Sequence, residues 1–564
     1  MSDANSNQDV SSPIIPPPNF PVTWEHLDDE LLFWQMDRMH FSESVTPATD
    51  EWINAFNEGF RRAAQSLHLA ISVRYIRINT YVYMAVVPMV PPEKMEAMGK
   101  KSEEKLNADM GRLSEWWETE LLPEIKEHLA YWENFDLRQA SMPTLIAHLE
   151  DTRARLTRLL HIHFLLSTPY LLAPSLFDEL YQELFGEESA PDAYQLLQGF
   201  SNKTVEAGTV LWKLSRKALR SSQVRNILEQ NQPAQVPAAL ERSAAGRTFL
   251  NELGAYLEEY GQRSDIFVEL GCPNWIENPV TPINNLQDFL TQPDRDLSAE
   301  IMTLAAEREQ RIAETRARLK GYPQPVVERF EFLLKAAQAW VILQEDHNYW
   351  IDQRAVYKVR LVLLEFGRRF TEAGVIEQSN DVFFLTPEEL RVTATGLPQG
   401  DRQQLVAQRK SEVDKFRTIQ PPPVLGTRPS GPPPDDPVSR SIGKYFGIPP
   451  QPSTESNVLR GTPCSAGKAR GVAKVVLSLA EAGKLQPGDI MVAPATMPAW
   501  TPLFASIAAV VTDVGGTLSH AAIVVREYNI PAVLGTGTAT SVIQDGQTLE
   551  VDGDAGIVRI ITSL

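Results

Sequence analysis

The stretch Gly515-Gly516-Thr517-Leu518-Ser519-His520-Ala521-Ala522-Ile523-Val524-Val525-Arg526-Glu527 decides how the C-terminal part of the chain folds. The apolar, strand-like residues 507–511 precede its two glycines, and no proline follows it until Pro531. We therefore expect His520 at a strand-to-helix turn, where free backbone N–H groups and the positive end of the helix dipole face outward. Such a position suits a histidine that carries a phosphoryl group.

The alternative is that His520 is a polar cap on a buried helix, as most isolated histidines are. Three features favour the phosphoryl carrier. Gly515 and Gly516 allow close approach of a ligand, Thr517 and Ser519 offer capping hydroxyls, and this part of the chain contains no other histidine. We expect these four residues to support a loop around His520.

Short strands and glycine turns alternate in the rest of the C-terminal part, which indicates a compact α/β module. Val524 and Glu527 share a helix face with His520, at spacings of four and seven residues. Arg526 points elsewhere and is expected to be structural or peripheral. The expected strands are residues 472–477, 489–494, 508–512, 532–534, 548–551 and 556–561.

The segment from about residue 459 to 561 closely resembles the swivelling phosphohistidine domain of the PEP-utilising, or dikinase, family. The likeness is carried by the stretch quoted above and by Asn529-Ile530-Pro531-Ala532-Val533 after it. It extends to two upstream segments, Gly461-Thr462-Pro463-Cys464-Ser465-Ala466-Gly467 and Pro494-Ala495-Thr496-Met497-Pro498-Ala499-Trp500. The resemblance implies a swivelling β/β/α domain in which His520 forms a phosphohistidine intermediate.

Composition indicates a soluble, cytoplasmic protein of several domains. The chain has 564 residues and a net charge of −19, which argues against nucleic acid or an anionic membrane as the main partner. Its two cysteines, Cys272 and Cys464, cannot form a disulfide framework and show no metal-type spacing. The start of the sequence lacks the pattern of a signal peptide, and no apolar run is long enough to predict a membrane span.

The predicted fold class is multi-domain α + α/β, in four segments. Residues 1–20 are expected to be a disordered tail and residues 21–417 an α-helical domain that binds the acceptor. Residues 418–455 form a proline-rich linker, and residues 456–564 form the phosphohistidine domain. The helical prediction rests on periodic apolar residues in several stretches, including residues 145–160, 298–320 and 356–370.

Three proline clusters, at residues 421–423, 432–434 and 449–452, mark the linker. Proline at this density predicts extended polyproline II geometry and not packed helix or sheet. A stretch of about 30 residues at roughly 3 Å each spans up to about 90 Å. That reach fits a carrier domain that visits two distant sites, although such segments are usually simple tethers.

The helical region resembles the acceptor-binding domain of rifampin phosphotransferase and of the split aryl-phosphate synthases. The likeness rests on Trp34-Gln35-Met36-Asp37-Arg38-Met39-His40-Phe41 and on His347-Asn348-Tyr349-Trp350-Ile351-Asp352-Gln353-Arg354. It continues through residues 364–369 and 381–385. We expect this region to be helical throughout, without the glycine-rich strands of an ATP-grasp domain. The pyruvate barrel that follows the histidine domain in some relatives is also missing before Leu564, so we do not expect pyruvate as the acceptor.

The resemblance implies a heteromeric complex. A separate ATP-grasp subunit would hold ATP and Mg2+, and His520 would take a phosphoryl group from it, with AMP and phosphate as by-products. The acceptor would be a small hydroxylated molecule, and the resemblance to the phenylphosphate and methylphenylphosphate synthases implies a phenol. The alternatives are antibiotic phosphorylation of the rifampin type and a non-catalytic carrier that relays the group to another protein.

For the second half of the reaction we expect a base and a cation on the helical domain. His347 is the predicted base and Arg354 the predicted phosphoryl clamp, because on an ideal helix seven residues place them on one face. Asp352 completes the predicted catalytic set, and Tyr349 and Trp350 are predicted to line an aromatic pocket. The alternative is that this run is buried packing with polar groups at the surface.

His40, His161 and His163 are alternative candidates for the second site. The spacing of two puts His161 and His163 on different sides of a helix, so we expect them to share no metal. An apolar, aromatic-lined cavity in the helical domain would favour an enzyme, whereas a solid core would favour the relay.

Overall fold

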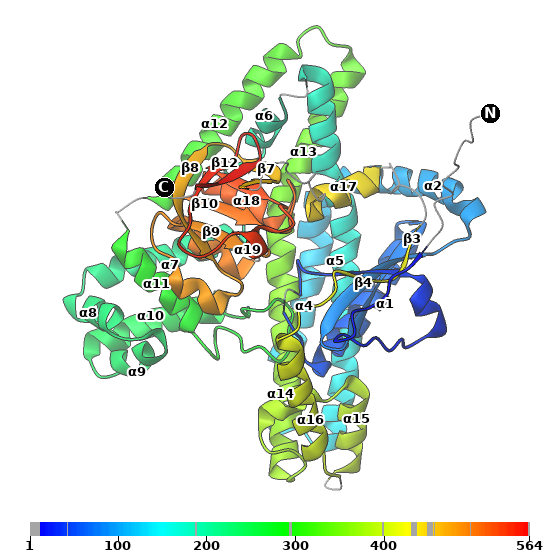
Figure 1. Cartoon of the computed structure of the whole chain (residues 1–564), viewed down its shortest axis with the longest axis vertical. Coiled ribbons are helices and arrows are strands. Elements are labelled where there is room, and N and C mark those ends of the chain that lie inside the picture. Colours follow the sequence, from blue (N-terminus) through cyan, green and yellow to red (C-terminus); the bar gives the residue numbers. More distant parts are fainter. Residues whose placement is uncertain are drawn as a thin grey trace.

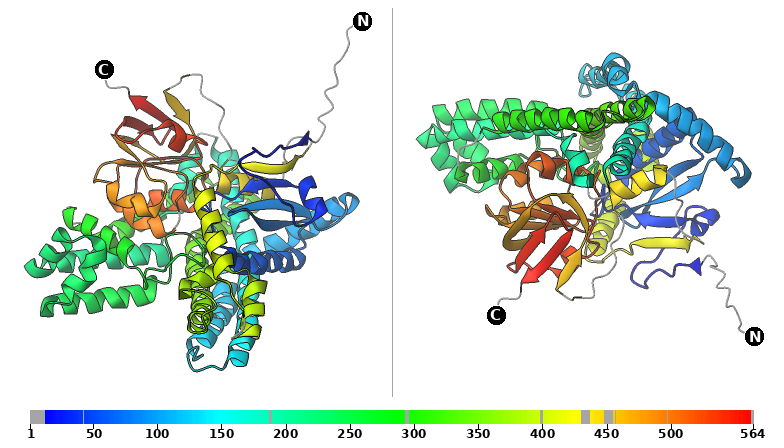
Figure 2. Two further views of the ribbon diagram at one scale, coloured as in Figure 1. Left: turned by 60° about the horizontal axis from the view of Figure 1, so that its bottom comes forward. Right: turned by 90° about the horizontal axis from the view of Figure 1, so that it is seen from above.

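The computed structural model describes residues 12–561 apart from 42, 187–188, 293–295, 398–399, 430–436, 448–454, 456 and 497. A column of long helices stands at the centre of the molecule (Figure 1). An antiparallel sheet packs on one side of this column and the C-terminal α/β domain on the other, as both views in Figure 2 also show. The predicted class, multi-domain α + α/β, is confirmed.

Five antiparallel strands form the first sheet. Its hairpin joins β3 (Ile71–Ile78) to β4 (Tyr81–Pro88), and Asn79 takes a φ of +55° at the turn. Asparagine is one of the few residues that adopt this left-handed conformation readily. Helix α1 (Asp50–Ser66) packs against β3. The sheet order is β1-β5-β2-β4-β3, in which β1 is Ser12–Pro13, β2 is Phe33–Met36 and β5 is Val424–Arg428.

This sheet corrects two predictions. The region before the linker is not helical throughout, because β3 and β4 are rich in the β-branched and aromatic residues that favour strands. Part of the predicted disordered tail is also ordered. Phe20 is fully buried, and its ring packs against those of Tyr81, Tyr83 and Phe416. Residues 1–11 lie outside the described residues.

Three long helices build the central column. α5 (Met142–Phe185) packs against both α1 and α13 (Gln324–His347), and the largest hydrophobic core runs along them. The π-helix η6 (Asn348–Ala355) connects α13 directly to α14 (Val356–Glu372). Of the described helices, only α5 is long and apolar enough to cross a membrane, and 72% of its most apolar window is buried inside the protein.

A side lobe with its own core extends from the column. It consists of α7 (Lys203–Leu219), α8 (Ser222–Gln230), α9 (Val236–Leu240), α10 (Ala244–Tyr260) and α11 (Val280–Thr291). The helices predicted at residues 298–320 and 356–370 are present as α12 and α14. The remaining α-helices of this part are α2 (Pro92–Met110), α3 (Leu113–Trp116), α4 (Leu122–Glu133), α6 (Ala190–Gln195), α12 (Leu297–Arg318), α15 (Pro387–Gly396) and α16 (Gln403–Arg417).

The C-terminal domain contains a mixed sheet of eight strands in the order β6-β13-β12-β8-β9-β10-β11-β7. Strands β8 to β11 are parallel neighbours and the other pairs are antiparallel. All six predicted strands are present, and two short ones were not predicted. The strands are β6 (Val458–Arg460), β7 (Thr462–Ser465), β8 (Lys468–Val475), β9 (Ile490–Ala493), β10 (Ala509–Thr512), β11 (Ala532–Leu534), β12 (Thr548–Asp552) and β13 (Ile557–Ile561).

Two helices, α18 (His520–Glu527) and α19 (Ala539–Val542), complete this domain. α18 buries Ala521, Ala522, Val524 and Val525 in the core of the C-terminal domain. This burial fixes the helix on the sheet and leaves its first residue at the edge of the domain.

The linker is not a purely extended tether, which corrects another prediction. Its residues 424–428 form the sheet strand β5, and α17 (Pro437–Phe446) is a helix that packs on α5. Pro437 begins α17, where a missing backbone N–H costs no hydrogen bond. The proline clusters at residues 432–434 and 449–452 lie outside the described residues.

Candidate functional site

His520 is the first residue of α18, after β10 and the two glycines, so the predicted strand-to-helix turn is present. Ser519 is the N-cap: its hydroxyl accepts from the Ala522 N–H and donates to the Gly516 carbonyl. Gly515 has a φ of +121°, a conformation that only glycine adopts without strain. The Thr517 hydroxyl is buried without a hydrogen-bond partner and is not the cap.

The backbone N–H groups of this loop are not free. Those of Gly515, Gly516 and Leu518 donate to the carbonyls of Phe446, Tyr445 and Lys444, each at 3.0 Å. These carbonyls belong to the last turn of α17, where a helix leaves its C=O groups without internal partners. The negative end of α17 therefore meets the positive end of α18. These N–H groups precede the N-cap Ser519, so they are not the first-turn N–H groups of α18 that were expected to face outward.

The His520 ring is only 5% exposed and lies where the C-terminal domain meets the helical column. Its Nδ1 is 2.9 Å from Oε1 of Glu345 on α13. Its Nε2 is 3.3 Å from the hydroxyl of Thr501, within its own domain. Because the contact at Nδ1 comes from the facing helix α13, part of the ring's cover is removed when the two parts separate.

Glu345 was not among the residues predicted from the sequence. It is buried, and its second carboxylate oxygen accepts from the Thr204 hydroxyl at 2.7 Å. Burial by itself raises the pKa of Glu345, but His520 and Thr204 outweigh it and the pKa lies below its ordinary value. Glu345 is therefore a carboxylate that holds a proton on Nδ1 of His520. An acidic side chain within an apolar helix was the only sequence signal for it.

The π-helix η6 places residues five apart on the same face, where an α-helix does not. His347 Nε2 lies 3.7 Å from Asp352 Oδ2, and Asn348 bonds Gln353 at 2.9 Å. A third ligand-type side chain, His163 on α5, lies 3.2 Å from the same Asp352 oxygen. His347 and Asp352, predicted to share a site, are thus brought together.

Arg354 and the predicted aromatic residues lie on another side of η6. Arg354 donates to the Tyr349 hydroxyl at 2.8 Å, and its guanidinium lies over the Trp350 ring. Tyr349 also bonds Glu259. The prediction that His347 and Arg354 share a face is wrong, because seven residues of a π-helix do not complete two turns.

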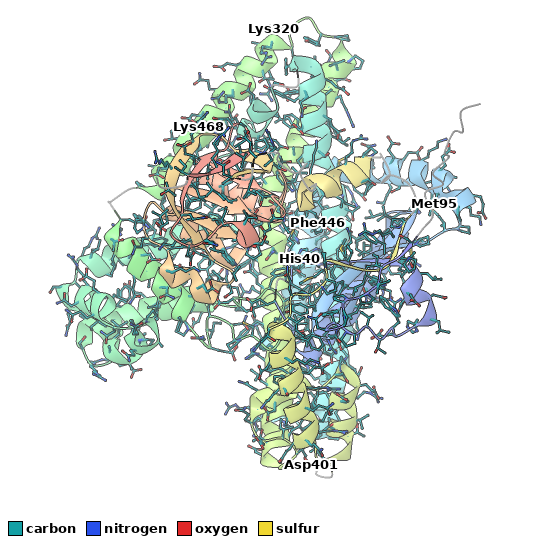
Figure 3. All side chains as sticks on the ribbon, in the orientation of Figure 1. His40, Met95, Lys320, Asp401, Phe446 and Lys468 are labelled. Atoms are coloured by element: carbon teal, nitrogen blue, oxygen red, sulfur yellow. The ribbon has the colours of Figure 1, made fainter. Side chains whose placement is uncertain are left out.

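A second histidine, His40, is only partly buried, with 23% of its side chain exposed. His40 Nδ1 lies 2.7 Å from Asp37 Oδ2, and the Tyr75 hydroxyl donates to the same oxygen at 2.9 Å. Burial lowers the pKa of His40, but the Asp37 carboxylate reverses this and the net pKa is raised. The His40 ring is 6.3 Å from that of Phe446, whose carbonyl holds the His520 loop (Figure 3). His40 is therefore connected to the His520 loop through Phe446.

His347 is electrostatically different from His40. Burial, with a contribution from His163, lowers the pKa of His347 to about 4. Its Nδ1 is 2.6 Å from the Leu343 carbonyl, so Nδ1 carries the proton and Nε2 keeps its lone pair. His347 is a neutral imidazole at physiological pH.

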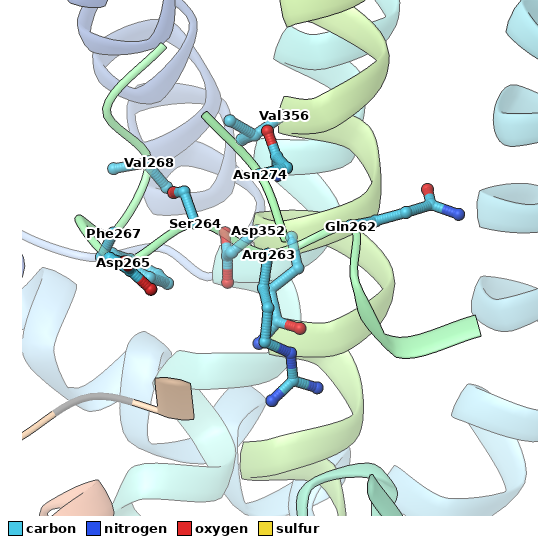
Figure 4. A pocket seen from close by; sticks show the side chains of 10 residues that line it. Gln262, Arg263, Ser264, Asp265, Phe267, Val268, Asn274, Asp352 and Val356 are labelled. Carbon is cyan, nitrogen blue, oxygen red and sulfur yellow. The ribbon is translucent and has the colours of Figure 1, made fainter. Parts of the chain in front are cut away.

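A small pocket beside this group is partly open to solvent, and its free interior of about 20 Å³ holds little more than a water molecule; Figure 4 shows the side chains that line it. Its wall includes Asp352, Arg263, Asp265 and Phe267. Polar and charged side chains predominate among the ten lining residues, and Tyr349 and Trp350 are not among them. The pocket is thus neither the predicted aromatic cavity nor a solid core.

Arg263 is the cation of this pocket and was not predicted. It is 4% exposed, its Nε donates to the Tyr260 carbonyl, and its Nη2 has no hydrogen-bond partner. Burial lowers its pKa, and its guanidinium lies over the Trp275 ring, 5.3 Å from the ring centroid, while no ion pair with a described carboxylate is present. A buried guanidinium without a counter-ion is suited to bind an anion.

The other predicted residues lie outside this group. His161 contacts Arg158, on a different side of α5 from His163. Arg526 donates to the Cys464 carbonyl and lies over the Tyr194 ring, which is a structural position.

Two family models match the chain. Residues 163–345 match the fourth domain of rifampicin phosphotransferase, and residues 485–556 match the mobile domain of PEP-utilising enzymes. The chain carries the mobile domain of the PEP-utilising enzymes. The resemblance inferred from the sequence is thereby confirmed, both for the mobile domain with His520 and for the helical region that faces it.

Three curated relatives extend the likeness. The chain is 40% identical over 97% of its length to chondramide synthase cmdD of Chondromyces crocatus, covering 14% of that protein. It is 31% identical over 71% of its length to the uncharacterized phosphotransferase YvkC of Bacillus subtilis, and 30% identical over 68% to a rifampicin phosphotransferase of Streptomyces sviceus. It covers 47% and 42% of these two proteins, so the chain spans less than half of each relative.

Proposed function

We propose that the chain carries a phosphoryl group on His520 and transfers it to the hydroxyl of a small organic acceptor bound by the helical part. The observation that carries this proposal is the position of His520, whose Nδ1 is held by Glu345 on α13, the helix that leads directly into η6. Relatives named as phosphotransferases over about 70% of the chain support the reaction class.

The phosphoryl group would come from ATP, held with Mg2+ by an ATP-grasp module, with AMP and phosphate released. We propose that this module is a partner subunit, and the greater length of the relatives leaves room for one on the same polypeptide. In either case His520 must leave Glu345 to be loaded and return to it to transfer.

Glu345 sets the state of the ring for transfer. With the phosphoryl group on Nε2, a proton on Nδ1 stabilised by the Glu345 carboxylate makes the imidazole a neutral leaving group. The N–P bond then breaks, the acceptor oxygen forms the new O–P bond, and the hydroxyl proton passes to a base. The ring is left with its proton on Nδ1 and a lone pair on Nε2.

His40 is a better base than His347. A general base works best with a pKa near the operating pH, whereas the pKa of His347 is lowered to about 4. The pKa of His40 is raised, and Asp37 fixes its proton on Nδ1 so that Nε2 can accept another. Asp37 thus plays the orienting role that a carboxylate has in catalytic triads.

Arg263 replaces Arg354 as the proposed phosphoryl clamp. Arg354 is already engaged by Tyr349 and its neighbours, while Arg263 lines the pocket with an Nη2 that has no partner. The planar guanidinium matches the oxygens of a transferred phosphoryl group.

A phenol is the first acceptor to test. Phe267 lines the pocket, and its ring lies 5.6 Å from that of His40, so an aromatic face lies beside the proposed base. A rifampicin-type hydroxyl is the second candidate, favoured by the matched fourth domain. A relay to another protein is the remaining alternative.

The test loads His520 chemically. Phosphoramidate phosphorylates the purified chain, and ³¹P NMR follows the phosphohistidine signal after addition of phenol, 4-methylphenol, rifampicin or buffer. We expect the signal in wild type and not in His520→Ala, and its conversion to a phosphate ester by one acceptor. His40→Gln should slow this conversion about 100-fold, whereas His161→Gln should not.

Two results would overturn the proposal: an equal phosphohistidine signal in His520→Ala, or decay in wild type that no acceptor accelerates. A second arm uses labelled ATP with and without a candidate ATP-grasp subunit. Label on His520 without that subunit would contradict the assignment of nucleotide binding to a partner.

A further inference from the structure

Three side chains of metal-ligating type meet between α5 and η6. Nδ1 of His163, Nε2 of His347 and a carboxylate oxygen of Asp352 all lie within 4.8 Å of one another. Two of the separations are 3.2 Å and 3.7 Å. Ligands about 2.0–2.1 Å from a tetrahedral ion lie about 3.3 Å apart, so these distances suit one small ion with little movement.

Two of the three ligand atoms have no hydrogen-bond partner. Asp352 is 3% exposed, and neither of its carboxylate oxygens accepts a hydrogen bond. His163 Nδ1 also has no hydrogen-bond partner, although it lies close to Asp352. The third atom, His347 Nε2, has only a long contact of 3.4 Å with the Tyr170 hydroxyl. A buried carboxylate without a donor is costly, and buried charges of this kind are normally paired or coordinate a metal.

The surroundings of His347 are those of a metal ligand. Its Nδ1 donates to the Leu343 carbonyl, which fixes the ring orientation and leaves the Nε2 lone pair directed at Asp352. Most metal-binding histidines are held by such a second hydrogen bond. The π-helix that brings His347 and Asp352 together is itself a feature found mainly at functional sites.

We propose that His163, His347 and Asp352 bind one divalent transition-metal ion. Two imidazoles and one carboxylate favour Zn2+, Co2+ or Fe2+ over Mg2+ or Ca2+, which prefer oxygen ligands. Asp352 also lines the pocket beside Arg263, so a fourth ligand position is open to water or to an acceptor oxygen. This site is separate from the Mg2+ expected with ATP, and the proposal does not depend on phosphoryl transfer.

The test titrates the full chain, first stripped with chelator, with Zn2+ in a calorimeter and with Co2+ in an absorbance spectrometer. We expect one ion per chain and a visible Co2+ band typical of four or five ligands. Asp352→Asn and His163→Gln should each weaken binding about 100-fold or more, because each removes a ligand. His161→Gln is the matched control, since it lies two residues away on α5 and contacts Arg158 instead.

Two ligand variants are used so that loss of a ligand can be distinguished from misfolding. The melting temperature of each is compared with that of His161→Gln. The proposal is wrong if wild type and Asp352→Asn bind Zn2+ equally, or if wild type binds none at 100-fold excess over protein. If one ligand variant unfolds, its loss of binding does not count. The other ligand variant must then lose the metal while it remains folded.

Discussion

Glu345→Gln tests the contact that seats His520. Both partners are almost fully buried, and the 2.9 Å bond joins a carboxylate to a ring N–H. Hydrogen bonds to charged groups contribute about 1.5–3 kcal/mol, which corresponds to about 10- to 150-fold in an equilibrium constant. A glutamine retains the shape, and its amide oxygen can still accept from Nδ1–H, but the bond loses the charge of the carboxylate, which costs about 1–1.5 kcal/mol. We therefore expect the mobile domain to separate from the column about 5- to 12-fold more often.

Hydrogen exchange measures this opening directly. The amides of Gly515, Gly516 and Leu518 bond the end of α17 only while the mobile domain is seated, so their protection should fall by the same factor. Asp346→Asn is the control, because Asp346 accepts from the Lys203 N–H and does not contact His520. Unchanged exchange of the loop in Glu345→Gln would refute the reasoning.

Three further predictions concern the same interface and pocket. Burial raises the pKa of Glu527 from 4.5 to about 7. Docking of the mobile domain on the column therefore takes up a proton, and the docked state becomes less stable as the pH rises from 4.5 to about 7. Glu527→Gln should remove this pH dependence from the hydrogen exchange of the loop, after correction for intrinsic exchange rates. In Gly516→Ala the new Cβ would lie 2.2 Å from the Lys444 carbonyl oxygen, so loop protection should be lost, whereas Gly483→Ala, which points into open space, should leave it intact. Arg263→Lys keeps the charge but loses the planar fork, and should slow single-turnover transfer from phosphohistidine about 10-fold or more, unless Arg263 is only structural.

The mobile domain was the most predictable part of the fold because its signals are local. Apolar runs bounded by glycines identified six strands, and the glycines before His520 marked the strand-to-helix turn. The two missed strands, β6 and β7, have three and four residues and no alternation of apolar and polar side chains. They exist because β13 and β11 provide partners, which a local pattern does not contain.

The arrangement of the acceptor side could not be predicted from α-helical periodicity. The run from His347 to Arg354 looks like a continuous helix, and an ideal helix pairs residues four and seven apart. The π-helix pairs residues five apart instead, which joins His347 to Asp352 and separates His347 from Arg354. Nothing in the residue types of this run distinguishes the two windings.

The residues that face His520 come from distant segments, and only tertiary structure brings them together. Glu345 lies 175 positions before His520 in the chain, and the Asp37–His40 pair lies near the start. Arg263 is one arginine among many in the sequence. Its lack of a counter-ion, which makes it a candidate, becomes visible only when its neighbours are known.

The contact between the linker helix α17 and the His520 loop affects how firmly the mobile domain is held with and without a phosphoryl group. The loop N–H groups of Gly515, Gly516 and Leu518, which precede the N-cap of α18, bond the carbonyls at the end of α17, and a phosphoryl anion on His520 would draw on N–H groups of the same turn. One N–H group cannot fully satisfy both acceptors, so α17 and an anion compete for the loop. Carbonyl oxygens at a helix C-terminus also repel an anion. The loop is therefore held less firmly by α17 when His520 carries a phosphoryl group than when it does not. This difference favours transfer of the phosphoryl group while the mobile domain is docked, and it keeps the unphosphorylated domain docked afterwards.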